Sequence, residues 1–424
     1  MRIRVIDYMA NHGGGMRVCS ELLTAFAELR PKVRFELVSH GAALDRYRAL
    51  LSSLGNRVEF VDIGPRSSLT MRYPRLLRVL RMGTENHFDV PEAAFRECDV
   101  AWLPWFHQHR IPDSVAAKVI ASFHDTIVMT EFLLDPFLAR FVPDEKDTTR
   151  QWLASKARIV VSSRTTVSAL GRILGAPPER FDFVPLSGRN ARMHLKEDKA
   201  PEWEWAQRPF LLCPANVAPH KNHELLFRGV GQLGGIHTLV LTGLGTELNR
   251  PRKRYFVRIG ERLGIIPLTR LTQLKRLAQS SGLTMGDKLI PLGYVSEEVY
   301  YSLLRCSWAL VMPTLAEGGG SAPVGEAALC GIPVICSDIP IMREHMERVG
   351  ARVLWFDPHN HEDLARRLKD LEDNYEQYKN IAVQQVGSLN PRTWRDVADD
   401  YWKIMLSTSL KTGGKSVQDT SCRA

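Results

Sequence analysis

Short apolar runs alternate with longer amphipathic stretches along almost the whole chain. In the first half, the apolar runs predict strands at residues 3–7, 33–38, 58–63, 99–103, 119–123, 158–161 and 181–185. Between them, apolar residues that recur every three to four positions predict helices at 16–29, 42–54 and from the cap Ser162-Ser163 to about residue 174. Strands separated by helices are typical of parallel βαβ units with right-handed crossovers.

The same alternation begins again after a polar stretch. Residues 188–208 contain two tryptophans and little periodicity, so we interpret them as an interdomain linker. Beyond the linker, strands are predicted at 210–213, 238–241, 289–292, 309–312, 334–336 and 353–356, and helices at 361–371, 375–386 and 394–406. The sequence therefore predicts two doubly wound α/β domains, residues 1–187 and 209–388, followed by a helical segment at 389–408 and a disordered tail at 409–424.

Length and composition support a globular protein with more than one core. The chain has 424 residues and seven scattered cysteines without C-x-x-C spacing, which favours a reduced, cytoplasmic protein without a disulfide framework. Apolar runs stay shorter than a membrane span requires, and the N-terminus begins as a strand instead of a signal peptide. We therefore expect a cytoplasmic location.

Basic residues give the chain a net charge of +9. They cluster at residues 66–81 and 250–276, where Leu, Met and Tyr are interleaved with the charges. This composition suits peripheral contact with the anionic inner face of a membrane, and it is equally consistent with a solvated basic surface. A nucleic-acid partner is not expected, because no known binding module is recognisable.

The densest candidate chemistry lies in residues 313–337, P-T-L-A-E-G-G-G-S-A-P-V-G-E-A-A-L-C-G-I-P-V-I-C-S. A strand leads into Glu317 and three glycines, and a helix that begins near Ser321 carries Glu326. Backbone N–H groups of a glycine loop and a helix N-terminus bind anions, and two carboxylates accept hydrogen bonds from hydroxyls. A nucleotide sugar is a ligand that carries both an anionic group and several hydroxyls. The alternative is a tight βα turn with surface glutamates.

Other strand ends carry weaker signals. Residues 214–223, P-A-N-V-A-P-H-K-N-H, follow a strand and place Lys221 at the start of a helix, where its ammonium suits a diphosphate; an exposed surface lysine is the alternative. The glycines at 243 and 245 follow another strand and indicate by themselves only a turn. Residues 293–296, G-Y-V-S, indicate a strand end and a helix cap.

Taken in order, these segments resemble the retaining GT-B glycosyltransferases of the glycogen synthase and α-mannosyltransferase type (glycosyl transferases group 1). The resemblance rests on P-A-N…H-K-N-H, L-T-G-x-G, L-G-Y-V-S and E-G-G-G-S-A-P-V-G-E-A-A-L-C-G-I-P-V-I. Weaker similarities are G-G-G-M-R at 13–17, F-H-D at 123–125, V-S-S-R-T at 161–165 and the final T-W-R-D-V-A-D-D-Y. The resemblance implies a GT-B fold of two Rossmann-like domains facing a central cleft, with the acceptor in the first domain, the nucleotide sugar in the second, and a last helix that crosses back to the first.

The resemblance also implies roles for particular residues. The predicted catalytic residues are Glu317, which would bind donor-sugar hydroxyls, Lys221, which would stabilise the leaving diphosphate, and His124, which would face the sugar. A structural role for His124 after its strand is the alternative. The predicted donor-binding residues are Glu326 at the ribose, Gly318, Gly319, Gly320 and Ser321 at the sugar or phosphate, and Asn216, Gly14, Gly15 and Gly243.

Two departures from the family's pattern bear on these roles. Glu317 and Glu326 are nine positions apart, one residue more than in the family's two-glutamate signature. Asn216 stands where the family usually has an arginine, so one cationic contact to the diphosphate is absent or is supplied by Arg17 or His220.

The resemblance implies transfer of a hexose, mannose as a first guess with GDP, otherwise glucose or another hexose with UDP. The acceptor would be a glycan or a lipid-linked glycan, as in bacterial surface polysaccharide synthesis. No cofactor and no metal are expected, since no Asp-x-Asp motif or histidine cluster is present. The alternatives are a catalytically inactive binding subunit of a polysaccharide assembly complex and a GT-B enzyme such as a sugar-nucleotide epimerase; a phosphorylase would need a cofactor-lysine signature that we do not find.

Overall fold

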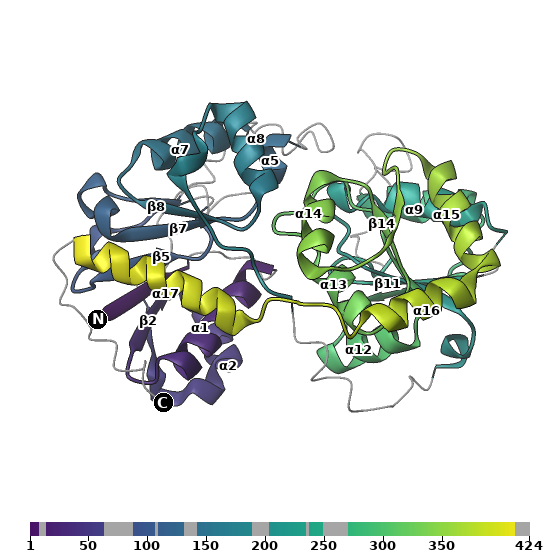
Figure 1. Cartoon of the computed structure of the whole chain (residues 1–424), viewed down its shortest axis with the longest axis horizontal. Helices are drawn as coiled ribbons and strands as arrows, with labels where there is room; N and C mark the ends of the chain where they lie inside the picture. Colours follow the sequence, from purple (N-terminus) through teal and green to yellow (C-terminus); the bar gives the residue numbers. More distant parts are fainter. Residues whose placement is uncertain are drawn as a thin grey trace, which may run out of the picture. The chain divides into compact units, whose positions relative to one another are not determined.

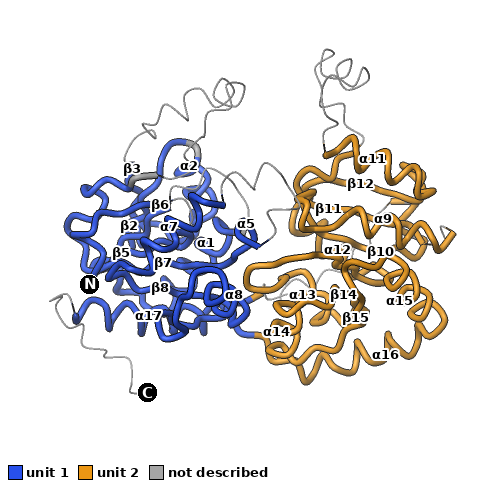
Figure 2. Tube along the Cα trace, turned by 90° about the horizontal axis from the view of Figure 1, so that it is seen from above, with its two compact units in different colours: residues 1–187, 392–424 blue, residues 188–391 orange. Residues whose placement is uncertain are grey.

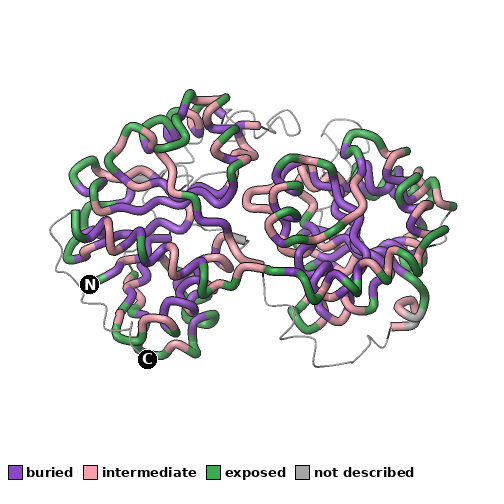
Figure 3. Tube along the Cα trace, in the orientation of Figure 1, coloured by how far each residue is buried: buried purple, intermediate pink, exposed green. Residues whose placement is uncertain are grey.

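The computed structural model describes residues 1–7, 14–62, 88–106, 109–130, 142–188, 203–234, 237–248 and 270–411. The chain divides into two compact units, Met1–Ser187 with Arg392–Ala424 (unit 1), and Gly188–Pro391 (unit 2) (Figure 2). Each unit is built around one parallel sheet whose strands are mostly buried (Figure 3). This confirms the predicted fold class of two α/β domains.

The sheet of unit 1 has seven strands in the order β3-β2-β1-β5-β7-β8-β9. Their bounds are β1 (Arg2–Ile6), β2 (Arg34–Ser39), β3 (Val58–Asp62), β5 (Val100–Leu103), β7 (Val119–Phe123), β8 (Arg158–Val161) and β9 (Phe181–Phe183). All neighbouring strands are parallel, and the order reverses between β1 and β5. Two further short strands, β4 (Phe88–Asp89) and β6 (His109–Arg110), pair with each other.

The helices of unit 1 pack against this sheet. The buried apolar residues between helices and strands form two separate clusters. Within the described ranges these helices are α1 (Gly14–Leu29), α2 (Gly41–Leu50), α5 (Ile127–Thr130), α7 (Val142–Ala154), α8 (Arg164–Leu174) and α17 (Trp394–Lys411). The N-cap of α8 is Ser163, whose side chain accepts the N–H of Thr166 at 3.0 Å, as the sequence predicted. Helix α7 was not predicted.

Helix α17 joins unit 1 although it is the last helix of the chain. It packs against α1 (Figure 1), and Val397, Tyr401 and Met405 are buried in the same cluster as the α1 residues. The hydroxyl of Tyr401 is hydrogen-bonded to Ser122 Oγ of β7 at 2.8 Å. The helix continues to Lys411, so the predicted helix end at 408 and tail start at 409 are wrong by about one turn.

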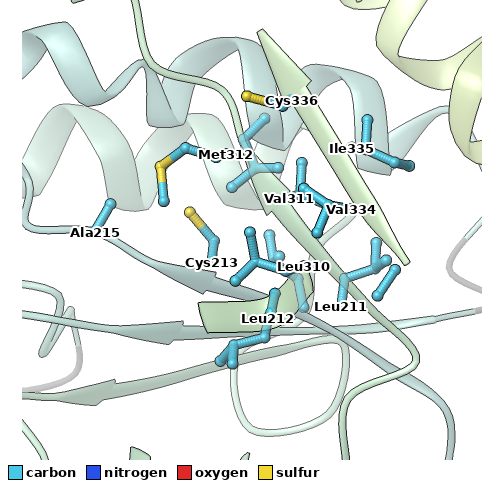
Figure 4. Packing of buried hydrophobic residues seen from close by; sticks show 14 of the residues in the cluster. Leu211, Leu212, Cys213, Ala215, Leu310, Val311, Met312, Val334, Ile335 and Cys336 are labelled. Carbon is cyan, nitrogen blue, oxygen red and sulfur yellow. The ribbon is translucent and has the colours of Figure 1, made fainter. Parts of the chain in front are cut away.

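The sheet of unit 2 has six parallel strands in the order β12-β11-β10-β13-β14-β15. Their bounds are β10 (Phe210–Pro214), β11 (Thr238–Thr242), β12 (Leu289–Gly293), β13 (Ala309–Met312), β14 (Val334–Ser337) and β15 (Leu354–Phe356). Figure 4 shows apolar side chains of β10, β13 and β14 packed together at the centre of this unit. The inner strands β10, β11, β13 and β14 are almost entirely buried on both faces and therefore read as continuous apolar runs.

Seven helices of the described residues surround this sheet. They are α9 (His223–Gly231), α11 (Arg270–Ser280), α12 (Glu297–Cys306), α13 (Ala322–Leu329), α14 (Pro340–Val349), α15 (His361–Asp373) and α16 (Tyr375–Gln385). Ser296 caps α12 by accepting the N–H of Val299 at 3.4 Å, as predicted. Trp203 and Trp205, which the sequence analysis assigned to the linker, stack at 5.1 Å and pack against the core of unit 2.

Several predictions fall on residues outside the described ranges. These are the basic segment 66–81, most of the segment 250–276, most of the linker and the end of the tail. Within the described part of the chain, no helix is both long and apolar enough to span a membrane.

Candidate functional site

The order of the strands in unit 2 indicates where a ligand would bind. The order reverses between β10 and β13, and ligands of open parallel sheets bind at the carboxyl ends of the strands beside such a reversal. The segments that leave these two strands contain the two richest motifs of the sequence. They are joined directly: the N–H of Leu315 donates to the carbonyl of His220 at 2.7 Å, and the hydroxyl of Thr314 donates to the same oxygen at 3.2 Å.

Lys221 and Glu317 form an ion pair at this point. Lys221 Nζ lies 2.5 Å from Glu317 Oε1, and the side chains are 16% and 10% exposed. An ammonium has three donors and a carboxylate has two acceptor oxygens, so the pair leaves hydrogen-bonding capacity on both groups. The arrangement can therefore present a cation and a carboxylate to one ligand. The two residues were predicted separately from two motifs, and the structure brings them together.

The glycine loop between Glu317 and α13 has an unusual conformation. Gly320 has a φ of +103°, and a Cβ at this position would lie 2.4 Å from Cγ of His345. Only glycine fits there without displacing the imidazole. Ser321 is the N-cap of α13, as predicted, although its side chain makes no capping hydrogen bond. The first turn of α13 offers few free donors, because Pro323 has no N–H and the N–H groups of Val324 and Gly325 donate to the carbonyl of Ser321 at 3.2 and 3.3 Å.

Glu326 lies on α13 and is 1% exposed. The hydroxyl of Tyr300, on α12, donates to Glu326 Oε2 at 2.7 Å. The additional residue between the two glutamates thus does not prevent Glu317 from pairing with Lys221 or Glu326 from being held on α13. Tyr300 was not singled out in the sequence, because one tyrosine on an amphipathic helix carries no distinctive signal.

The predicted glycine at 243 is required for close packing of two strand ends. Gly243 has a φ of +129°, and a Cβ there would lie 2.8 Å from the carbonyl carbon of Ala215. The adjacent Asn216 is exposed, and its Oδ1 accepts the N–H of Ala218 at 3.0 Å. Asn216 therefore shapes the turn that leads to Lys221. Its contact with a donor stays a prediction.

The histidines beside Lys221 are neutral at neutral pH. Burial, followed by the charge of Lys221, lowers the pKa of His220 from 6.5 to about 3. Burial likewise lowers the pKa of His223 to about 3, with smaller contributions from Arg270 and Lys221. The lowered pKa weighs against His220 as a replacement for the missing cationic contact, and that role stays a prediction.

The predicted residues of unit 1 lie near the corresponding strand ends of that sheet. Gly14 and Gly15 form the start of α1, which follows β1. His124 follows β7, is 1% exposed, and has Nε2 3.1 Å from the carbonyl oxygen of Pro104. Its ring also contacts that of Trp105, with centroids 4.9 Å apart. These contacts favour the structural role for His124, and contact with a sugar stays a prediction.

The described residues contain no group of three or more His, Cys, Asp or Glu side chains placed to hold a metal ion. Six cysteines lie in the described ranges and all are free thiols. Burial raises the pKa of Cys213 from 9.0 to about 12, so this thiol is a poor nucleophile at neutral pH. The candidate chemistry of unit 2 therefore rests on the lysine, the two glutamates and the backbone N–H groups.

These features describe a parallel α/β protein with a candidate site for an anion and hydroxyls at the strand reversal of its second unit. Residues 196–384 match the family model "Glycosyl transferases group 1". The match covers most of the second unit and agrees with the family that the motifs predicted.

Similar proteins agree with this assignment. The chain is 25% identical over 325 residues to the serotype-specific mannosyltransferase WbdA of Escherichia coli, which covers 73% of this chain and 36% of the relative. The chain thus spans about a third of the length of this curated relative.

Among solved structures, the fold matches Anabaena Alr3699/HepE in complex with UDP and glucose. The TM-score is 0.60 at 16% identity, with 97% of this chain and 98% of the other covered. It also matches WaaG, a glycosyltransferase involved in lipopolysaccharide biosynthesis, with a TM-score of 0.63 at 12% identity, covering 95% and 99% of the two chains. At these identities the matches show the fold, which is that of GT-B glycosyltransferases.

Proposed function

We propose that this glycosyltransferase moves a hexose, mannose in the first instance, from a nucleotide diphosphate sugar to a hydroxyl of a glycan or lipid-linked acceptor, with retention of configuration. The observation that carries the proposal is the Lys221–Glu317 pair at the strand reversal of unit 2, 2.5 Å between Nζ and Oε1. Its cation suits a diphosphate and its carboxylate suits sugar hydroxyls. Both partners are side chains that the sequence motifs predicted.

The proposed chemistry is electrostatic. Negative charge grows on the departing diphosphate as the glycosidic bond breaks, and Lys221 with the backbone N–H groups of the glycine loop would stabilise it. Glu317 would hold the sugar hydroxyls, and Glu326, fixed by Tyr300, would hold the ribose. Neither carboxylate is proposed as a nucleophile, in contrast to retaining glycosidases. The acceptor would attack from the face that the leaving group vacates, and the departing phosphate would take its proton.

The similar proteins support particular choices of donor and acceptor for this proposal. WbdA is a mannosyltransferase, which favours GDP-mannose as the donor. HepE was solved with UDP and glucose, which makes a UDP-hexose the next candidate. WbdA is serotype-specific and WaaG acts in lipopolysaccharide biosynthesis, so we propose a surface polysaccharide as the product and the inner face of the membrane as the place of work.

Calorimetric titration with GDP and UDP, followed by a panel of nucleotide sugars with chromatographic detection of products, tests this proposal. We expect saturable binding of one of the two nucleotides, and transfer from the corresponding sugar nucleotide. A chain that binds neither nucleotide refutes the proposal. Binding without turnover of any donor would favour the inactive binding subunit, and an isomerised sugar nucleotide without transfer would favour an epimerase.

A further inference from the structure

We propose that Arg348 and His345, on α14, are positioning residues that orient the peptide group between Gly319 and Gly320 so that the N–H of Gly320 is presented to the bound donor. This inference rests on the proposed function and assigns a role to a helix that no motif of the sequence indicated. Helix α14 contacts the glycine loop through both side chains.

Arg348 holds the carbonyl side of this peptide group. Its Nη2 donates to the carbonyl oxygen of Gly319 at 3.2 Å and to Nδ1 of His345 at 3.0 Å. Its Nη1 lies 3.8 Å from Oε1 of Glu344, one turn earlier on the same helix. The guanidinium is 18% exposed and planar, so three partners fix its orientation.

His345 supports the loop from the same side. Because Nδ1 accepts from Arg348, the ring proton of the neutral imidazole is assigned to Nε2. The ring is 7% exposed, and burial, with the nearby charge of Arg348, lowers its pKa to about 3. It occupies the space in which a side chain at residue 320 would lie, and a Cβ at Gly325 would be 3.4 Å from Nε2. The loop and the first turns of α13 therefore rest on one buried, uncharged ring.

The geometry of the peptide bond then sets the direction of the N–H. The peptide bonds of the described residues are all trans, so the C=O of Gly319 and the N–H of Gly320 point in opposite directions. When Arg348 holds the carbonyl toward α14, the N–H of Gly320 points away from α14. A donor bound beside Glu317 would meet this N–H already oriented, which avoids reorganisation during the reaction.

The test compares Arg348→Met with Arg343→Met as a matched control. Arg343 lies on the same helix but pairs with Asp338 and stacks over Trp355 at 4.2 Å, so it does not contact the loop. Two readouts are needed: amide hydrogen exchange of residues 318–322, with strand β13 as an internal reference, and steady-state kinetics of transfer with the donor varied. Arg348→Lys serves as the conservative variant.

We expect Arg348→Met to raise amide exchange in the loop but not in β13, and to lower kcat/KM for the donor by about tenfold to a hundredfold, the effect of losing a hydrogen bond from a charged donor. The fall should lie mainly in kcat. Arg348→Lys should restore part of it, and Arg343→Met should change neither readout. Gly320→Ala, which displaces His345, should act in the same direction as Arg348→Met.

The proposal is overturned if Arg348→Met matches Arg343→Met in either readout. If Arg348→Met also raises amide exchange in β13, the variant is globally destabilised, and the result for Arg348→Lys decides. Wild-type exchange and wild-type kcat in Arg348→Lys would overturn the proposal. Exchange and kcat that both lie between those of the wild type and Arg348→Met would support it. A wild-type chain that binds no nucleotide refutes the proposed function instead, and the loop exchange still shows whether Arg348 holds the loop.

Discussion

Replacing Lys221 by Met removes the ammonium that lies 2.5 Å from Glu317 and leaves that carboxylate unpaired with only 10% of its side chain exposed. Removing one partner of a fully buried pair costs about 3–5 kcal/mol of stability. Because both side chains keep some contact with water, we expect a smaller loss, about 1–3 kcal/mol, for Lys221→Met. Glu317→Gln keeps the shape of the side chain and should cost a similar amount.

The double variant, with Met at 221 and Gln at 317, completes a double-mutant cycle that measures the interaction energy between Lys221 and Glu317. It leaves no unpaired charge, so its loss of stability should be smaller than the sum of the two single losses by about 1–2 kcal/mol. Activity should behave differently. Loss of a preorganised group that stabilises the transition state typically costs about a hundredfold to a thousandfold in kcat, so each single variant should lose transfer by at least this order.

Urea unfolding followed by tryptophan fluorescence measures the stabilities, and release of nucleoside diphosphate in the presence of acceptor measures turnover. Lys288→Met is the control, because Lys288 lies in the same unit and donates only to the carbonyl of Gly234, at 3.2 Å on the exposed surface. Calorimetry should show that Glu317→Gln still binds the nucleotide. Additive stabilities in the cycle, or wild-type turnover in either single variant, would refute the reasoning.

Two further predictions concern the surroundings of the pair. Tyr300→Phe removes the hydroxyl that donates to the buried Glu326 at 2.7 Å, so it should lower the free energy of unfolding by about 1.5–3 kcal/mol and weaken nucleotide binding. The control Tyr294→Phe, at a residue that is 80% exposed, should change neither the stability in urea nor the binding in calorimetry. Equal effects of the two variants would contradict the role of Tyr300. Burial lowers the pKa of His223 from 6.5 to about 3, so the unfolded chain binds a proton below pH 6.5 that the folded chain does not, and stability falls as pH falls. In His223→Leu the loss between about pH 7 and about pH 5.5 should be smaller by about 1.3 kcal/mol, and an unchanged pH dependence would show that His223 is not the cause.

The periodicity of the sequence predicted the fold well because the parallel sheets are buried. Strands β7, β8 and β13 begin and end where their apolar runs do. Helix α7 was missed for the opposite reason: its sequence V-P-D-E-K-D-T-T-R-Q-W-L-A is mostly polar, and it buries Thr148, Thr149 and Trp152 among contacts that no periodic pattern reveals. The end of α17 was placed too early because Thr408 and Ser409, which are polar, are buried there.

The candidate site was predictable only as far as its motifs extend. Lys221 and Glu317 each follow a strand with a distinctive sequence, but their pairing depends on β10 and β13 being neighbours, which the sequence suggests only through the fold. Tyr300 and Arg348 reach the site from α12 and α14, where they look like ordinary residues of amphipathic helices. Side chains that support a site from a neighbouring helix leave no local signal.

The glycine loop shows why such supporting contacts matter in this chain. Three consecutive glycines have more conformational freedom to lose than other residues, about 0.5–1 kcal/mol each relative to alanine, and the loop is one residue longer than the family's signature. A loop of this kind is poorly preorganised by itself. The contacts of Arg348 with Gly319 and of His345 beneath Gly320 restrict it from one side, and Lys221 restricts Glu317 at its start. The longer loop and the contacts of Arg348 and His345 are therefore best understood together, because a loop with more conformational freedom is tolerable where a neighbouring helix holds one of its peptide groups.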